Sequence, residues 1–303
     1  MYKSILVPLD GSAFAEGAIG PAITLAEKAG GRVCLLAVHC HPTDDAAVDP
    51  EAAKKYLRDV MIRFRPVTSS SIATKVRFGP EVAVEIAAEA SAHDLIVMTS
   101  HGRGGLARAW FGSVADECVR TSSTPILVLR PLESGPASLR LEISKVVVPL
   151  DGSELAETIL PTAAYVADLL DVPITLLRSV VVPVTSYVGY FPQTDSRLPV
   201  DDAEAYLQQI VSTHLAGLRQ RPTVQVTIGP HAARDICELA GSDSLIAMAT
   251  HGRGGAQRTF LGSITDEVIR ATESVVLVLR PGGNVESPRD AEDGAEVFGR
   301  VTL

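Results

Sequence analysis

The chain has 303 residues, which is enough for two domains of ordinary size, and 46% of them are hydrophobic and 21% charged. Its formal net charge of -9 argues against a general affinity for the nucleic-acid backbone, and no run of 18 apolar residues predicts a membrane span. The first residues do not resemble a signal peptide, so we expect a cytoplasmic protein.

Strand-like and helix-like segments alternate along the first part of the chain. Apolar runs typical of buried parallel strands occupy residues 5–9, 33–38, 95–98 and 126–129, and a more polar run at 73–78 predicts a strand nearer the sheet edge. Helical patterns lie between them, at about 13–29, 51–64, 81–90 and 113–120.

The same plan then occurs a second time. "VPLDGS" near the N-terminus recurs 141 residues later, so that Pro8 matches Pro149, whereas the glycine-rich stretch after the fourth strand recurs after 150 residues, so that Gly102 matches Gly252. The nine extra residues fall in the middle of the second copy, where an insertion occupies about 183–199. We expect its aromatic residues to form a surface contact or to cover a pocket.

We therefore predict an α/β protein made of two tandem Rossmann-like domains. Each domain should be a five-stranded parallel sheet with helices on both faces. The boundaries are 1–137 for the first domain and 143–281 for the second, followed by a polar tail at 282–303 that we expect to be flexible. These two repeats are called the first copy and the second copy below.

The four cysteines are predicted to be free thiols. They form no C-x-x-C pair and no zinc-ligand spacing, and three of them lie in apolar stretches that favour burial. The "HCHP" run that starts at His39 favours a loop at a strand end over a metal site, because adjacent ligands in an extended segment diverge. No metal site is predicted.

Two kinds of loop are expected to meet at the carboxyl edge of each sheet, where open parallel sheets bind ligands. One carries Asp-Gly-Ser after the first strand, beginning at Asp10 or Asp151. The other carries "HGRGG" after the fourth strand and ends in Gly-Ser at a helix start. Glycines let the backbone approach a ligand and adopt positive φ, and the helix start adds a hydroxyl, N–H groups and the positive end of a dipole. This combination favours a phosphate group, and the aspartate could accept from an adenine amine or a ribose hydroxyl, or help hold a metal ion.

Each motif also has a plain structural interpretation. Asp-Gly-Ser is a common turn and helix cap, and Gly-Ser is a common cap. His101 and His251 lack a paired nucleophile and suggest loop hydrogen bonding, and the aromatic residues just before the Gly-Ser suggest packing. The recurrence of both motifs at one edge in both copies shifts the balance toward a ligand.

Several enzyme classes lose support because their motifs are absent. The sequence has no G-x-x-x-x-G-K-[ST], no G-x-G-x-x-G after its first strand and no G-x-S-x-G. We expect no catalytic residues and at most a weak ATPase.

"VPLDGS", "DLIVMTSHGRGG" and "FGSVADECVRTSSTPILVLRP" together resemble the universal stress protein family, and the chain is similar to its tandem two-domain members. The resemblance covers about 1–131 and 143–281, and it implies that each domain is of the adenine nucleotide alpha hydrolase-like type. ATP-binding members carry a glycine, two residues, a glycine, nine residues, then glycine and Ser or Thr. Both copies keep the last two elements, but Thr99 and Ala249 stand where the first glycine is expected.

The resemblance implies an adenine-nucleotide site in each copy. In the first copy the implied site residues are Pro8, Asp10, Val38, Met98, Thr99, Gly102, Gly112, Ser113 and Val114. In the second copy they are Pro149, Asp151, Ser179, Met248, Ala249, Gly252, Gly262, Ser263, Ile264 and Thr265. Arg103 and Arg253 are added from their position, because each follows a loop glycine and could touch a phosphate, although a plain surface charge is the alternative. Two differences between the copies bear on the site: Thr265 stands where the first copy has Ala115 and adds a hydroxyl, and Ser179 stands where it has the apolar Val38.

The resulting hypothesis is a regulatory stress-response protein that binds ATP, AMP or another adenine nucleotide, with magnesium or manganese as a candidate companion ion. A non-nucleotide-binding scaffold with degenerate pockets and a slow ATPase remain alternatives. We expect no nucleic-acid or membrane partner. The resemblance also implies that the two copies pair through their last strands about a pseudo-twofold axis, with a homodimer as a further possibility.

Overall fold

The computed structural model describes residues 1–40, 50–100, 111–130, 141–180, 198–250 and 261–281. The first copy forms, in chain order, β1 (Ser4–Leu9), α1 (Ala13–Glu16), α2 (Ile19–Ala29), β2 (Arg32–Cys40), α3 (Pro50–Phe64), a 3-10 turn (Arg65–Val67), β3 (Ser71–Gly79), α4 (Val82–Ala90), β4 (Leu95–Thr99), α5 (Ser113–Thr121) and β5 (Ile126–Leu129). The second copy forms β6 (Lys145–Pro149), α6 (Glu154–Glu157), α7 (Leu160–Leu170), β7 (Ile174–Val180), α8 (Leu198–His214), β8 (Thr223–Ile228), α9 (Ala232–Ala240), β9 (Ser244–Ala249), α10 (Ser263–Ala271) and β10 (Val275–Leu279).

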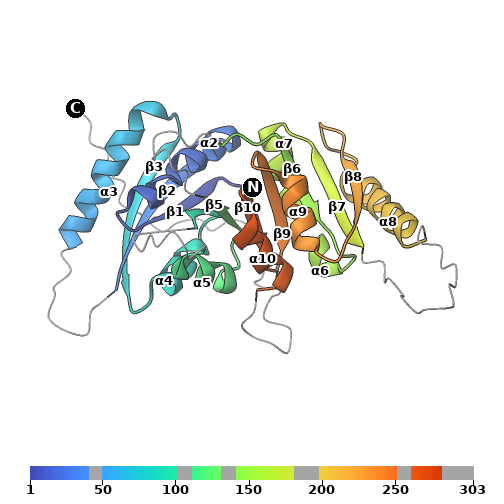
Figure 1. The fold of residues 1–303 in the computed structure, drawn as a ribbon. Helices are drawn as coiled ribbons and strands as arrows, with labels where there is room; N and C mark the ends of the chain where they lie inside the picture. Colours follow the sequence, from blue (N-terminus) through green and yellow to red (C-terminus); the bar gives the residue numbers. More distant parts are fainter. Residues whose placement is uncertain (41–49, 101–110, 131–140, 181–197, 251–260, 282–303) are drawn as a thin grey trace.

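All these strands join one sheet in the order β3-β2-β1-β4-β5-β10-β9-β6-β7-β8 (Figure 1). Neighbouring strands are parallel within each copy, as predicted, and β5 and β10 are antiparallel to one another. We call this β5–β10 pair the seam, because it is where the two copies meet. The polar strand predicted nearer an edge is β3, and it does end the sheet.

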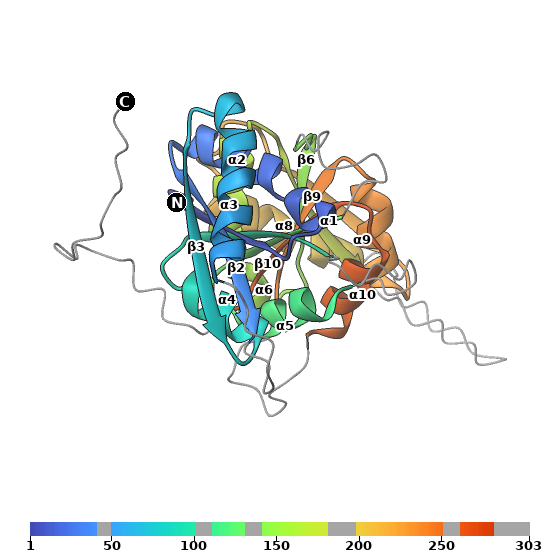
Figure 2. The same ribbon diagram turned by 90° about the vertical axis from the view of Figure 1, so that its left-hand side faces the viewer.

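Helices cover both faces of the sheet because successive residues of each buried strand point to opposite sides. In β1, Ile5 and Val7 pack with residues of α2 and α3, whereas Leu6 packs with residues of α4 and α5. In the second copy α7 and α8 continue the first layer, and α9 and α10 lie on the other face. Figure 2, turned by 90°, shows α3 on one side of the first copy's strands and α4 with α5 on the other.

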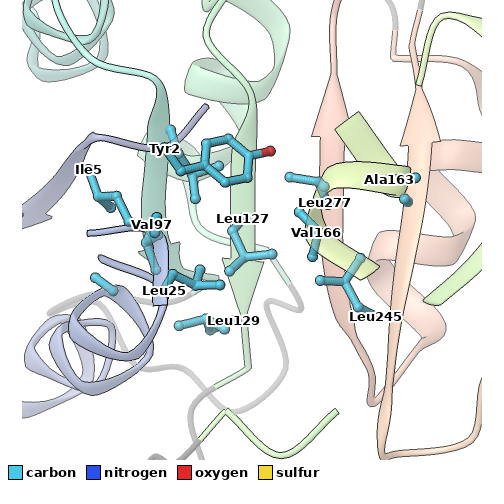
Figure 3. Packing of buried hydrophobic residues seen from close by; sticks show 14 of the residues in the cluster. Tyr2, Ile5, Leu25, Val97, Leu127, Leu129, Ala163, Val166, Leu245 and Leu277 are labelled. Atoms are coloured by element: carbon cyan, nitrogen blue, oxygen red, sulfur yellow. The ribbon is translucent and has the colours of Figure 1, made fainter. Parts of the chain in front are cut away.

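The apolar core is continuous across the seam on one face. Leu127 of β5 stands opposite Leu277 of β10, and both side chains are buried. Figure 3 shows them side by side, with Val166 of α7 close to Leu277. Tyr2 and Tyr165 add an edge-to-face ring contact between the copies, with ring centres 5.2 Å apart.

One predicted element in each copy is wrong in extent. The pattern at 13–29 predicts one helix, but the chain forms α1 and α2 in the first copy and α6 and α7 in the second. Pro21 and Pro161 lie in the first turns of α2 and α7. A proline has no N–H to donate to the carbonyl four residues before it, so a continuous helix would lose a hydrogen bond at this point.

The first copy carries a charged cluster around the buried carboxylate of Glu89, beside its edge strand. The carboxylate of Glu89 accepts hydrogen bonds from Lys75 at 2.8 Å and Arg77 at 3.1 Å, and His93 Nε2 lies 3.5 Å from it. Burial is the largest influence on the pKa of Glu89 and raises it, but the hydrogen bonds from these neighbours outweigh burial and leave the pKa below its usual value. Burial lowers the pKa of His93 despite the adjacent carboxylate.

Both shifts predict that acid destabilises the protein. A lowered pKa means that the unfolded chain takes up protons first, so stability declines as the pH falls below about 6.5 for His93 and below about 4.3 for Glu89. We expect His93→Gln to remove the earlier part of this decline. Urea unfolding of the parent protein and the variant at pH 7.0, 6.0 and 5.0 measures the free energy of unfolding at each pH. The same decline with pH in both proteins would contradict the prediction.

Candidate functional site

The first copy has a cavity of about 1020 Å³ at the carboxyl ends of β1, β2 and β4. β1 lies between β2 and β4 in the sheet. The strand order therefore reverses at β1: β2 and β3 follow on one side of it, and β4 and β5 on the other. Such a switch in strand order opens a crevice at the carboxyl edge of a parallel sheet. The predicted position of the site is therefore a hollow in the structure.

Apolar side chains form much of the cavity wall. Val38 from β2, Met98 from β4 and Ile86 from α4 lie on one side, and Ala53 and Tyr56 from α3 lie on the other. Largely apolar walls with a few polar groups are typical of small-molecule sites.

Asp10 lies at the turn that follows β1. Its Oδ1 accepts hydrogen bonds from the Ser12 backbone N–H at 2.9 Å and the Ser12 hydroxyl at 2.6 Å, and Ser12 Oγ in turn accepts from Ala15 N at 3.1 Å. Gly11 has φ of 86°. The plain interpretation of Asp-Gly-Ser as a turn and helix cap is thus confirmed, and the same turn places Asp10 and Pro8 in the cavity wall.

The start of α5 forms the opposite end of the cavity. Gly112 is the residue that caps this helix, its N–H donates to the Ser100 carbonyl at 2.6 Å, and Ser113, Val114 and Ala115 follow along the cavity wall. The first N–H groups of a helix have no acceptor within the helix and lie at the positive end of its dipole. These groups are suited to an anion.

The loop before α5 and its counterpart before α10 differ from expectation in the backbone conformation of their last glycines. The glycines of these loops are expected to permit positive φ, but Gly112 has φ of -71° and Gly262 has φ of -54°, so the expectation is wrong for these two. The glycines of "HGRGG" lie outside the described residues. Positive φ occurs instead at Gly11 and Gly152, in the turns after β1 and β6. Thr99, at the position of the missing first glycine, is buried and lines the cavity beside Met98.

Four predicted site residues lie outside the described residues, namely Gly102, Arg103, Gly252 and Arg253. The same holds for His101 and His251. Of the aromatic and apolar pairs before the Gly-Ser, Phe111 and Leu261 are described, and both pack into one core cluster as predicted. Phe111 also reaches the cavity wall.

Tyr56 lines the cavity, although no motif in the sequence singles it out. Its hydroxyl donates to Glu16 at 3.1 Å, and Glu16 accepts two hydrogen bonds from Arg63, each at 2.9 Å. Burial and the Glu16 carboxylate raise the pKa of Tyr56, so the hydroxyl stays protonated. The signal that could have identified it is repetition, because Tyr206 recurs 150 residues later and donates to Glu157 at 2.8 Å.

The second copy repeats the turn after the first strand. Asp151 Oδ1 accepts from the Ser153 N–H at 2.9 Å and hydroxyl at 2.6 Å, and Pro149 ends β6 just before it. Burial is the largest influence on the pKa of Asp151 and raises it, but the hydrogen bonds from Ser153 and the charge of Arg178 bring the pKa below its usual value. The carboxylate is therefore held in its ionised form.

Arg178 makes the second copy different from the first. It stands where the first copy has Ala37, and its guanidinium carbon lies 4.9 Å from the centre of the Tyr206 ring. A Cβ placed on Gly152 would come within 2.6 Å of the same guanidinium. The positively charged side chain of Arg178 thus covers the Tyr206 ring and the turn at Gly152. The equivalent residues of the first copy, Tyr56 and Gly11, line its cavity.

Other predicted residues of the second copy lie at the same sheet edge. Ser179, near the end of β7, donates to Asp235 at 2.6 Å, and Thr227 donates to the same carboxylate oxygen at 2.9 Å. Met248 and Ala249 end β9. At the start of α10, Gly262 is the capping residue, Ser263 and Ile264 are exposed, and Thr265 is buried.

The cavity of the first copy also contains a residue of the second copy. Arg270, near the end of α10, lines it together with Asp116 of α5. The sequence could not predict this contact, because it depends on how α5 and α10 meet at the seam.

Of the cysteines, all four are free, and Cys34 and Cys118 are buried. Cys237 is partly buried and Cys40 is exposed. No helix within the described ranges is both long and apolar enough to cross a bilayer. Nor do the described residues gather three or more His, Cys, Asp or Glu side chains in a metal-binding group.

Comparison with known proteins agrees with the repeat. The sequence profile of the Universal stress protein family matches residues 1–130 and 142–280. A universal stress protein of Mycobacterium tuberculosis is 30% identical over 201 residues, which are 65% of this chain and 64% of that relative's length. A universal stress protein of Mycolicibacterium smegmatis is 26% identical over 235 residues, 76% of this chain and 75% of the relative.

The fold comparison agrees as well. A universal stress protein of Archaeoglobus fulgidus has a TM-score of 0.69 with this chain at 19% identity, covering 93% of this chain and 100% of its own. That likeness shows a common fold. Because the family profile matches both copies, and with them most of the chain, the protein belongs to the universal stress protein family.

Proposed function

We propose that the first copy binds an adenine nucleotide in the cavity at the carboxyl ends of β1, β2 and β4. The observation that carries the proposal is that one cavity brings together a carboxylate, an apolar wall and the first turn of a helix. These are the groups that a ribose, a base and a phosphate need, respectively. The cavity volume of about 1020 Å³ is large enough for a ligand of this size.

Each part of the ligand has suitable partners among the cavity residues. Asp10 can accept hydrogen bonds from ribose hydroxyls or from the adenine amine, and Val38 and Met98 offer apolar surface to the base. The N–H groups at the start of α5, beginning at Ser113, are suited to a phosphate. ATP and AMP both satisfy these requirements, and a magnesium or manganese ion would accompany a polyphosphate.

We propose that the second copy binds nucleotide more weakly. Arg178 covers Gly152 and the Tyr206 ring, whereas the first copy has only Ala37 at that position. Ser179 is tied to Asp235, so its hydroxyl is already engaged. A nucleotide in the second copy would have to displace Arg178 or bind beside it.

The proposed role is regulatory. The described residues of the cavity supply groups suited to binding. Nucleotide occupancy would act by changing loop order or assembly, which partners would recognise. We place this activity in the cytoplasm. We further propose that the two copies pair about a pseudo-twofold axis through β5 and β10, and that the chain can form a homodimer.

Isothermal titration with ATP, ADP, AMP and cyclic AMP, with and without magnesium or manganese, tests the proposal. We expect one stronger site per chain and a second site at least about tenfold weaker, a difference of about 1.4 kcal/mol. Absence of heat and of any thermal shift at millimolar nucleotide would contradict nucleotide binding and favour a scaffold. Phosphate release that exceeds an Asp10→Asn, Asp151→Asn control would instead show a slow ATPase.

A further inference from the structure

Four charged side chains meet where α5 and α10 lie beside one another. They are Asp116 and Arg120 of α5 and Asp266 and Arg270 of α10, and each pair occupies equivalent positions in the two copies. Both ribbon views place these two helices together near the seam (Figures 1 and 2). We call these four residues the seam cluster.

Each aspartate in the seam cluster has a close arginine partner on its own helix and a more distant one across the seam. Arg120 donates to both Asp116 oxygens, at 2.8 and 3.0 Å, and Arg270 Nε donates to Asp266 at 2.9 Å. The contacts across the seam, Arg120 to Asp266 and Arg270 to Asp116, are both 3.9 Å long. At 3.9 Å between partly exposed groups, such a contact contributes little.

Of the two arginines in the seam cluster, Arg270 lines the cavity and Arg120 does not. Arg270 lines the cavity of the first copy, in company with Gly112, Ser113 and Asp116. Its side chain remains 45% exposed, so it retains freedom to change partner. Asp116 would keep its two close hydrogen bonds from Arg120 if Arg270 moved away.

The backbone that carries Arg270 is fixed to the first copy. Arg130 Nη2 donates to the Arg270 carbonyl oxygen at 2.7 Å. This bond ties the C-terminal end of α10 to the residue that follows β5. The backbone of Arg270 is thereby held by a residue of the first copy, whose cavity the Arg270 side chain lines.

A second cation would favour a phosphate at this end of the cavity. Asp116 lies in the first turn of α5, so its carboxylate would repel a phosphate bound at the start of that helix. Arg120 neutralises that charge but is already held by both Asp116 oxygens. Arg270 is suited to supply the remaining positive charge, because a guanidinium can donate two parallel hydrogen bonds to phosphate oxygens.

We propose that Arg270 of the second copy is a phosphate-binding residue of the nucleotide site in the first copy. This inference rests on the proposed function of that cavity. On binding, Arg270 would exchange its 3.9 Å contact with Asp116 for the phosphate, and its bond with Asp266 would weaken. Nucleotide in one copy then changes an ion pair of the other, which gives a physical route for coupling across the seam.

Two matched variants test the proposal by affinity. Arg270→Gln and Arg120→Gln each remove one arginine of the seam cluster at equivalent positions, but only the first removes a residue of the first-copy cavity. ATP and adenosine are titrated into the full chain and both variants by calorimetry. We expect Arg270→Gln to weaken ATP at the stronger site about tenfold or more while adenosine changes less than about twofold, since only the phosphates are affected.

Arg120→Gln should weaken ATP at the stronger site clearly less than Arg270→Gln does, because it exposes the charge of Asp116 but removes no group of the cavity wall. The salt dependence of ATP binding should also become shallower in Arg270→Gln, because a cation at the phosphates has been removed. Equal ATP affinities in the two variants would overturn the proposal, provided that the parent chain binds ATP. If the parent binds neither ATP nor adenosine, the proposed function itself fails, and thermal unfolding without ligand shows whether either variant is misfolded.

Discussion

Gly112→Val is expected to reduce nucleotide affinity at the stronger site by about 100-fold or more, equivalent to about 2.8 kcal/mol. Gly112 lines the cavity and caps α5, so a branched side chain would enter the space that the phosphate needs. The backbone itself should accept valine, because φ of -71° and ψ of 146° are favourable for β-branched residues. The loss should therefore arise from obstruction of the site and not from a distorted helix start.

The matched control is Gly262→Val, at the equivalent position of the second copy. This variant should leave nucleotide binding at the stronger site unchanged and abolish only the heat of binding at the weaker site. Calorimetric titration of both variants with ATP measures the difference, and thermal unfolding without nucleotide verifies that the helix start is preserved. An unchanged affinity in Gly112→Val would show that this glycine serves only the local turn.

Much of the fold could be predicted because short-range sequence patterns determine its strands and helices. Buried strands appear as continuous apolar runs such as the one at β1, and the alternation of strands with helices restricts the topology to a parallel sheet. The duplication adds an internal check, since an element found in one copy is expected in the other. The helix break before Pro21 was missed, although the proline was visible, because the apolar pattern continues through it.

The site was predictable only where one strand and its own loop define it. Asp10 and Gly112 follow directly from motifs in the sequence and lie in one cavity. Arg270 and Arg178 could not be identified in this way. Arg270 reaches the cavity through the pairing of β5 with β10, and Arg178 lies over both the Tyr206 ring and Gly152, an arrangement of side chains that no sequence motif encodes.

Leu277→Ala should lower the free energy of unfolding by about 2–5 kcal/mol, as expected when a leucine is truncated in a core. Leu277 is fully buried in β10, stands opposite Leu127 of β5 and packs in a cluster that contains residues of both copies (Figure 3). The side chains beside it belong to elements fixed by their own packing, so they can fill the vacated space only in part. Urea unfolding at constant pH measures the change.

Ile228→Ala is the matched control, because Ile228 is 62% exposed at the end of β8 and its truncation should change stability by less than about 0.5 kcal/mol. A continuous core across the seam also predicts that Leu277→Ala weakens both copies together, in one unfolding transition. Nucleotide bound in the first copy should then protect the second copy as well, since it stabilises the shared folded state by mass action. Two separate transitions, with only one shifted by Leu277→Ala, would show that the copies unfold independently and that the seam transmits no stability between them.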